Sequence, residues 1–220
     1  MPFIIGYILF FFALLFAKLK RSNRIIDRNG LVSNPSILLL LHIVGIILFG
    51  LLPILFADKS FLQVAIGKSQ PPDTLPAITI GLTVIVLIVV PRLADKDVDQ
   101  IKRVLSHTPL GPAFLTNYFI LRIAFLCCYE VSFRGYFLSA TAEAFGWIIA
   151  ATLNIVLYVL IHFVNGKDEM KGCIPLGLIF CSLCFWGQAA WPAIVLHVAI
   201  TTSYETRLLN KINHPSIAIV

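Results

Sequence analysis

The sequence predicts an all-α fold, a polytopic transmembrane helical bundle, and three observations lead to this prediction. Of the 220 residues, 59% are hydrophobic and only 13% are charged, whereas soluble domains carry about 25% charged residues. The mean hydropathy is +0.91. The apolar residues also form runs close to the roughly 20 residues that a helix needs to cross a bilayer. We therefore expect a single integral membrane domain, residues 1–220, with about seven spans and a range of about six to eight.

Seven apolar runs follow one another along the chain. They lie at about 2–17, 35–57, 75–90, 113–128, 145–164, 173–186 and 189–204. Basic residues follow the first run instead of preceding it, which indicates a retained span and not a cleaved signal peptide. The polar stretch 58–74 contains two consecutive prolines and indicates a loop. The mixed charges of 92–112 indicate an amphipathic or solvated connector.

The sequence also predicts how the last two apolar runs are connected and what role the cysteines have. The last two runs are separated only by Gly187 and Gln188, which predicts a tight hairpin or one broken helix. Four of the five cysteines fall within apolar runs and Cys173 lies at the edge of one, so disulfides are not expected to organise the fold. Cys181 and Cys184 have the CxxC spacing, but no second pair completes a zinc set, and we interpret them as small residues for helix packing.

The basic residues indicate how the chain crosses the membrane. Segments 18–33, 92–112, 166–172 and 205–220 contain 13 of the 17 lysines and arginines. Because cytoplasmic loops carry an excess of basic residues, we expect the N-terminus outside and the C-terminus in the cytoplasm. In a prokaryotic cell this would be the plasma (inner) membrane. Residues 129–144 are assigned to the outer side, although the sequence also allows them to continue as a helix within the membrane.

The net charge of +6 does not indicate a nucleic-acid surface. The basic residues stand in short segments between apolar runs, where they are better explained as topology signals. The expected surroundings are therefore a lipid bilayer, and no nucleic-acid partner is expected.

Three polar pairs in the C-terminal half carry the functional signal. Each pair has i, i+4 spacing, so both side chains lie on one face of a helix. The pairs are Glu130 with Arg134, Tyr158 with His162, and His197 with Thr201. Ionisable residues within membrane segments are functional candidates because they are costly to bury. His42, in contrast, has no partner at helical spacing, and we expect a packed, hydrogen-bonded role for it.

These residues allow two chemistries and one purely structural role. In the first chemistry, Glu130 acts as general base on a water that His162 helps to orient, and His197 with the Thr201 hydroxyl stabilises an oxyanion. In the second, Glu130, His162 and His197 are ligands to one divalent metal ion, for instance zinc, with an open position for water. The structural role is helix packing by an ion pair and two hydrogen-bonded histidines. The spacing does not decide among them, so the cofactor is either absent or a divalent metal.

The residues around the pairs resemble three motifs of one family. Residues 130–138 read EVSFRGYFL and resemble the first motif, EExxxR followed by FRGYL, of the CPBP family of CAAX protease and bacteriocin-processing intramembrane peptidases. Residues 158–162 read YVLIH and are similar to its second motif, FxxxH. Residues 191–197 read WPAIVLH and resemble its third. The motifs occur in the family's order, and the core that carries them is residues 113–204.

The resemblance implies an endopeptidase that hydrolyses a peptide bond of a membrane-anchored substrate, near its C-terminus or in a leader. It implies a glutamic or metal-dependent mechanism, with the first-motif glutamate and second-motif histidine activating water and the third-motif histidine holding the oxyanion. The catalytic residues would be Glu130, Arg134, His162 and His197. The supporting residues would be Tyr129, Tyr158 and Thr201.

The sequence departs from the family pattern at two positions. Thr201 stands where an asparagine is common, and its hydroxyl can still donate a hydrogen bond. Tyr129 stands where the first glutamate is expected, and that glutamate is the one usually credited with activating water. Either Glu130 takes over this role, with Tyr129 as an orienting phenol, or hydrolysis is lost.

Three other functions stay open at this point. A non-hydrolytic relative could serve as an immunity or regulatory membrane protein that binds a peptide in the same cavity. An ion-coupled transporter or channel could use the buried Glu, Arg and His as a relay. A membrane cysteine protease could use Cys127 or Cys128 as nucleophile, with His162 or His197 as its base.

Overall fold

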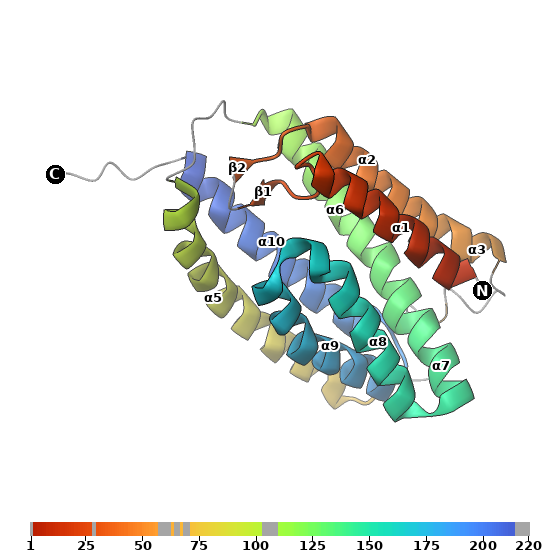
Figure 1. Cartoon of the computed structure of the whole chain (residues 1–220). Coiled ribbons are helices and arrows are strands. Elements are labelled where there is room, and N and C mark those ends of the chain that lie inside the picture. The colour runs from red at the N-terminus through yellow and green to blue at the C-terminus, as the bar shows by residue number, and fades with distance from the viewer. Residues whose placement is uncertain are drawn as a thin grey trace.

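The protein is a bundle of helices (Figure 1), as the sequence predicts. The computed structural model describes residues 2–27, 30–56, 63, 67, 71–102 and 110–213. The N-terminal elements are α1 Pro2–Leu19, β1 Ile26–Asp27, β2 Gly30–Leu31, α2 Pro35–Ile46, the π-helix η1 Ile47–Leu51 and α3 Leu52–Phe56. The later elements are α5 Thr74–Lys102, α6 Pro112–Glu130, the π-helix η2 Val131–Phe137, α7 Leu138–Phe145, α8 Trp147–His162, the 3-10 turn η3 Phe163–Asn165, α9 Lys167–Gly187 and α10 Trp191–Asn213.

Five of the described helices are long and apolar enough to cross a membrane. They are Pro35–Phe56, Thr74–Val98, Pro112–Phe145, Trp147–Asn165 and Lys167–Gly187. Phe3–Leu19 is a shorter apolar helix, and α10 covers the last predicted run. The α5 span turns most of its Ile and Val side chains outward, and so large an exposed apolar surface indicates contact with lipid. The chain is therefore an integral membrane protein.

Residues 129–144 do not emerge from the bundle. The rod from α6 through η2 to α7 is helical without a break from Pro112 to Phe145, so the alternative that this segment continues as a helix is confirmed. Arg134 is only 1% exposed, and Glu130 is fully buried. A buried guanidinium is tolerated here because a carboxylate one turn away neutralises it.

The connector predicted at 92–112 begins as a continuation of α5, which is helical to Lys102. Two of its acidic residues, Asp95 and Asp97, bind α10. Arg207 donates two hydrogen bonds, of 2.8 and 2.9 Å, to the carboxylate of Asp95, and the Tyr204 hydroxyl donates one of 2.5 Å to Asp97. Residues 103–109 and most of the predicted loop 58–74 lie outside the described residues.

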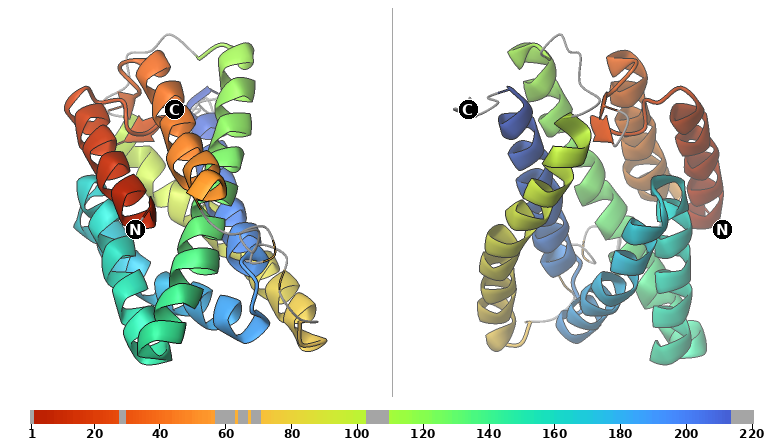
Figure 2. Two further views of the ribbon diagram at one scale, coloured as in Figure 1. Left: turned by 90° about the vertical axis from the view of Figure 1, so that its right-hand side faces the viewer. Right: turned by 60° about the vertical axis from the view of Figure 1, so that its left-hand side comes forward.

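The short hairpin of β1 and β2 is an element that the sequence did not predict. Ile26 pairs with Leu31, and Asp27 pairs with Gly30, in antiparallel register. The hairpin follows α1 at the end of the bundle where α1, α5 and α10 end and α6 begins (Figure 2). The predicted tight turn after Gly187 is present, with Gln188 in the left-handed conformation at φ 48°.

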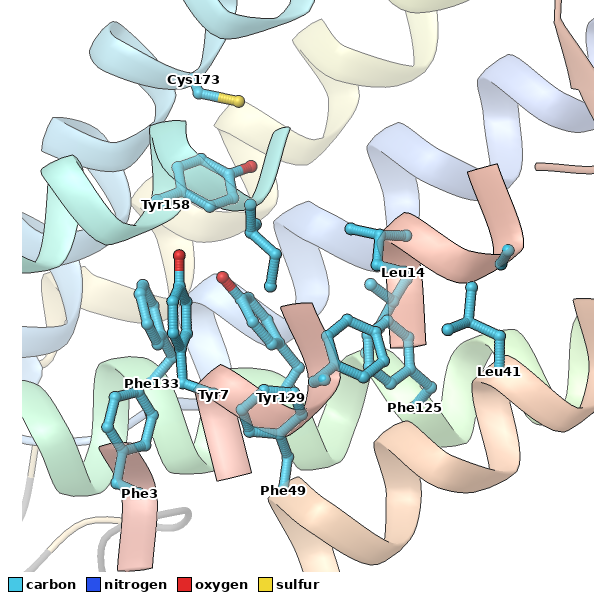
Figure 3. Packing of buried hydrophobic residues seen from close by; sticks show 14 residues of the cluster. Phe3, Tyr7, Leu14, Leu41, Phe49, Phe125, Tyr129, Phe133, Tyr158 and Cys173 are labelled. Carbon is cyan, nitrogen blue, oxygen red and sulfur yellow. The ribbon is translucent and has the colours of Figure 1, made fainter. Parts of the chain in front are cut away.

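Aromatic side chains fill the core between α1, η1 and the α6–η2 rod (Figure 3). The ring of Phe49 lies 5.2 Å from Phe10 and 5.3 Å from Tyr129, measured between centroids. Gly45 lets α2 approach α6 closely, because a Cβ at this position would lie 2.3 Å from the Phe125 ring. This packing fixes the rotation of the rod and hence the direction in which Glu130 points.

Candidate active site

Glu130 and Arg134 form the predicted ion pair at the junction of α6 and η2. Arg134 Nη1 donates to both carboxylate oxygens of Glu130, at 2.9 Å to Oε1 and 3.0 Å to Oε2. Neither side chain is accessible to solvent. Since an isolated buried charge is costly and a buried pair needs good geometry, the two residues act as one structural unit.

His197 reaches the same carboxylate from α10. Its Nδ1 lies 2.5 Å from Glu130 Oε1, and a carboxylate can only accept, so Nδ1 carries the proton. The other ring nitrogen, Nε2, faces away from Glu130. The His197 side chain is 10% exposed, whereas Glu130 and Arg134 are 0% exposed. His197 is therefore the member of this three-residue unit that a ligand can approach.

Four aromatic rings surround the Arg134 guanidinium. Its carbon lies 4.2 Å from the centroid of Tyr158, 4.7 Å from Phe133, 5.4 Å from Phe180 and 5.6 Å from Tyr129. Aromatic faces attract cations, more strongly when both are desolvated. The rings therefore stabilise the buried cation and hold it against Glu130.

Tyr129, the residue that replaces the family's first glutamate, is a buried packing residue. Its ring centroid lies 5.0 Å from that of Phe133 and 5.3 Å from that of Phe49. Figure 3 shows the hydroxyl on the side of the ring that faces Tyr158. Among the residues that the structure describes, this hydroxyl has no hydrogen-bond partner, and neither do Nε and Nη2 of Arg134. Buried donors without an acceptor are uncommon. These O–H and N–H groups of Tyr129 and Arg134 are therefore available to donate to an acceptor atom of a ligand.

The π-helical turn η2 is held by side chains from neighbouring helices. The Ser132 hydroxyl donates to the carbonyl of Phe49 in the other π-helix, η1. Asn154 Nδ2 on α8 donates to the carbonyl of Phe133 at 2.9 Å, and its Oδ1 accepts from the Cys181 thiol at 3.3 Å. π-helical turns free backbone carbonyls and are frequent at functional sites. Asn154 is a polar residue in an apolar run, which was the available signal, but no local spacing revealed its role.

His162 lies beside the Glu130 unit but does not join it. Its Nδ1 lies 2.8 Å from the carbonyl of Tyr158, which only accepts, so Nδ1 carries the proton and Nε2 has the lone pair. Nε2 lies 3.7 Å from Oε1 of Glu169. The Tyr158 ring lies near both imidazoles, with its centroid 4.6 Å from His162 and 6.1 Å from His197. Glu169 was not among the predicted site residues, because no motif includes it.

The donor set does not fit the predicted metal ion. Within the described parts of the chain, no group of three or more His, Cys, Asp or Glu side chains is placed to hold a metal. Glu130, His162 and His197 fail to converge because His162 directs Nε2 to Glu169, while both oxygens of Glu130 already accept hydrogen bonds. The thiol alternative has no support either, since no hydrogen bond joins Cys127 or Cys128 to a histidine among the residues described.

A second buried polar cluster lies further along α6 and α10. Arg122 Nη2 lies 3.5 Å from Oε1 of Glu205, and Arg122 Nη1 lies 3.4 Å from His42 Nε2. His42 Nδ1 bonds the carbonyl of Leu38 at 2.7 Å, which confirms the packed, hydrogen-bonded role predicted for this histidine. The cluster crosses three helices and neutralises a basic residue within the α6 span. Thr201 lies between the two clusters on α10 and is buried.

The comparison with known families finds a match in the C-terminal half of the chain. Residues 111–203 match the model of the family described as type II CAAX prenyl endopeptidase Rce1-like. Among curated protein sequences, none matches the chain. The matched range contains all three motifs, the Glu130 unit and His162. For residues 111–203, this match confirms the resemblance to the CPBP family that the three motifs indicate.

Proposed function

We propose that the protein hydrolyses a peptide bond of a membrane-anchored substrate near its C-terminus or in a leader. The observation that carries this proposal is the buried Glu130, Arg134 and His197 unit, in which two family motifs meet and only the imidazole is open to a ligand. The name of the matched family favours a prenylated C-terminal segment as the substrate class. Such a substrate would enter from the bilayer, since lipid-facing helices surround the site.

Glu130 serves as the anchor of His197 in the proposed mechanism. The sequence suggested Glu130 as the general base, and that role remains a prediction. The geometry favours an anchor, because Oε1 and Oε2 both accept from Arg134 and Oε1 also accepts from His197. A carboxylate at Nδ1 stabilises the imidazolium, whose Nε2–H can then donate to the oxygen of the scissile carbonyl. The Thr201 hydroxyl, one turn further on the same helix, is the second donor.

His162 acts as the base toward water. Its Nδ1–H is held by the Tyr158 carbonyl, so the Nε2 lone pair is available. The water oxygen forms a bond with the carbonyl carbon while one water proton passes to Nε2. The C–N bond then breaks, and the same proton moves to the leaving amine. His197 holds the negative charge on the carbonyl oxygen between these steps.

The test uses purified protein in detergent micelles and a fluorogenic peptide that ends in a prenylated cysteine and three further residues. His162→Ala and His197→Ala should abolish cleavage. Glu130→Gln should retain cleavage lowered by only about 10-fold, because an amide oxygen can still accept from Nδ1, whereas loss of a general base lowers the rate by about 100- to 10,000-fold. Glu143→Gln, a carboxylate on α7 outside the site, is the matched control.

Three results would contradict the proposal or part of it. Wild-type cleavage rates in both His162→Ala and His197→Ala would refute the proposed mechanism. Complete loss in Glu130→Gln, with folding retained, would restore Glu130 as the base. Binding of the prenylated peptide without cleavage by the wild type would favour the non-hydrolytic regulatory alternative, with Tyr129 as the reason.

The proposed orientation keeps the N-terminus outside and the C-terminus in the cytoplasm. The arrangement of the helix ends supports this orientation. The basic segments predicted to be cytoplasmic lie at the ends of α1, α5 and α10, and these three helices end at the same end of the bundle, where α6 begins (Figure 2). Basic residues favour the cytoplasmic side. The turn between α8 and α9, with Lys167 and Lys171 close to it, would then face the cytoplasm as well.

A further inference from the structure

A polar cluster lies around the turn from α8 to α9, and apart from His162 its members have no role in the mechanism described so far. We call it the turn cluster; its members are Asn23, Arg24, His162, Asn165 and Glu169. Gly166 allows the turn because its φ is 110°, a value that other residues rarely adopt. The turn brings the first helical turn of α9 back to the end of α8. Glu169 and His162 thereby meet although they lie on different helices.

The carboxylate of Glu169 is fixed by neighbours that leave one face of it open. Asn165 Nδ2 donates to Oε1 at 2.8 Å, and Asn165 Oδ1 accepts from Asn23 Nδ2 at 3.1 Å. Arg24 forms an ion pair with Oε2. An oxygen of a carboxylate has two lone pairs, so Oε1 can accept one more hydrogen bond. His162 Nε2 lies on that side, at 3.7 Å.

The two facing atoms are both acceptors. His162 must use its proton at Nδ1 for the Tyr158 carbonyl, so neutral His162 cannot donate to Glu169. A water molecule solves this problem, because its two protons can be taken by Nε2 and by Oε1. Two such bonds of about 2.8 Å place the acceptors roughly 4.4 Å apart. A small rotation of Glu169, whose side chain is 35% exposed, opens the gap to that distance.

We propose that Glu169 is a catalytic carboxylate that binds the attacking water together with His162. It would supply the acidic group that is missing from the first motif, where Tyr129 is buried among aromatic rings. Glu169 Oε1 accepts one water proton as a hydrogen bond, and His162 Nε2 removes the other. The water oxygen bonds to the carbonyl carbon, the C–N bond breaks, and the proton on Nε2 goes to the leaving amine. Glu169 stays ionised throughout.

This assignment rests on the proposed peptidase function, and the kinetic experiment separates the two. The prenylated fluorogenic peptide is used with the full chain in micelles. Glu169→Gln should lower kcat by about 100-fold with little change in KM, and Glu169→Asp should recover part of the rate. Asp168→Asn, in the same first turn of α9, should behave as wild type. A Glu169→Gln rate within twofold of wild type, while His162→Ala is inactive, would overturn the role of Glu169 and leave the peptidase function intact.

A second measurement does not depend on cleavage. In protein labelled with ¹⁵N-histidine, the Nε2 signal of His162 should move in Glu169→Gln and stay unchanged in Asp168→Asn. The His197 signal should stay unchanged in both variants, because His197 bonds Glu130. An unmoved His162 signal in Glu169→Gln would overturn the pairing, whether or not any peptide is cleaved. A wild type that cleaves no peptide but shows the expected shift would refute the peptidase function and with it the catalytic role of Glu169, and would leave only the pairing of Glu169 with His162.

Discussion

Replacing Arg134 with methionine should be among the most destabilising single changes in the bundle. The variant keeps a long apolar side chain with good helix propensity, so the charge and its hydrogen bonds are what is lost. Glu130 would lose the donor that binds both of its oxygens and would keep His197. Removing one partner of a buried ion pair costs about 3–5 kcal/mol. Loss of the cation from the aromatic rings adds on the order of 1 kcal/mol.

The assay is reversible unfolding in mixed micelles with increasing denaturing detergent, from which the free energy of unfolding is extrapolated. The double variant Glu130→Gln/Arg134→Met should be more stable than the sum of the single effects predicts, with a coupling of about 1–3 kcal/mol. Arg207→Met is the control, since Arg207 also makes two hydrogen bonds to a carboxylate but is 41% exposed. Its loss should lower the free energy of unfolding far less than the loss of Arg134, because water screens an exposed ion pair. A cost below about 1 kcal/mol for Arg134→Met, or strict additivity in the double variant, would refute the reasoning.

Two further predictions concern the support of the site and its orientation. Asn154→Leu leaves the Phe133 carbonyl without its donor and should lower the free energy of unfolding by about 1–3 kcal/mol, measured in the same micelles; an unchanged value would show that the π-helical turn does not need this bond. For orientation, Lys211→Cys should react with a membrane-impermeant thiol reagent only after a bacterial host's inner membrane is opened, whereas Phe145→Cys at the opposite end should react in intact spheroplasts. The reverse pattern would invert the proposed topology.

The spans could be predicted because a membrane helix must satisfy its backbone hydrogen bonds internally. Local hydropathy is then sufficient to locate most of them. The ambiguity at residues 129–144 has a definite cause. Glu130, Ser132 and Arg134 make this segment look polar, but their partners on α10, in η1 and within the rod itself allow the helix to continue. Such partners lie up to 83 residues away in the sequence and cannot be identified from a local window.

The site could be predicted in part. The Glu130 and Arg134 pair is local, since i, i+4 spacing brings the two side chains together in any helix. The contact of Glu130 with His197 and the separation of His162 from both depend on how α8 and α10 are rotated. Glu169 had no signal at all, because its approach to His162 is produced by a turn through Gly166 and by Arg24 from a distant segment.

The sequence by itself determined that this is an all-α membrane protein, with three family motifs in order and an ion pair at the first of them. Only the tertiary structure decided that His197 binds Glu130, that Tyr129 is a packing residue, and that His162 faces Glu169. The physical reason is the range of the interactions. Hydropathy and helical spacing act over a few residues, whereas pairing between helices follows from rotations that side-chain packing sets, as where Gly45 lets α2 approach Phe125.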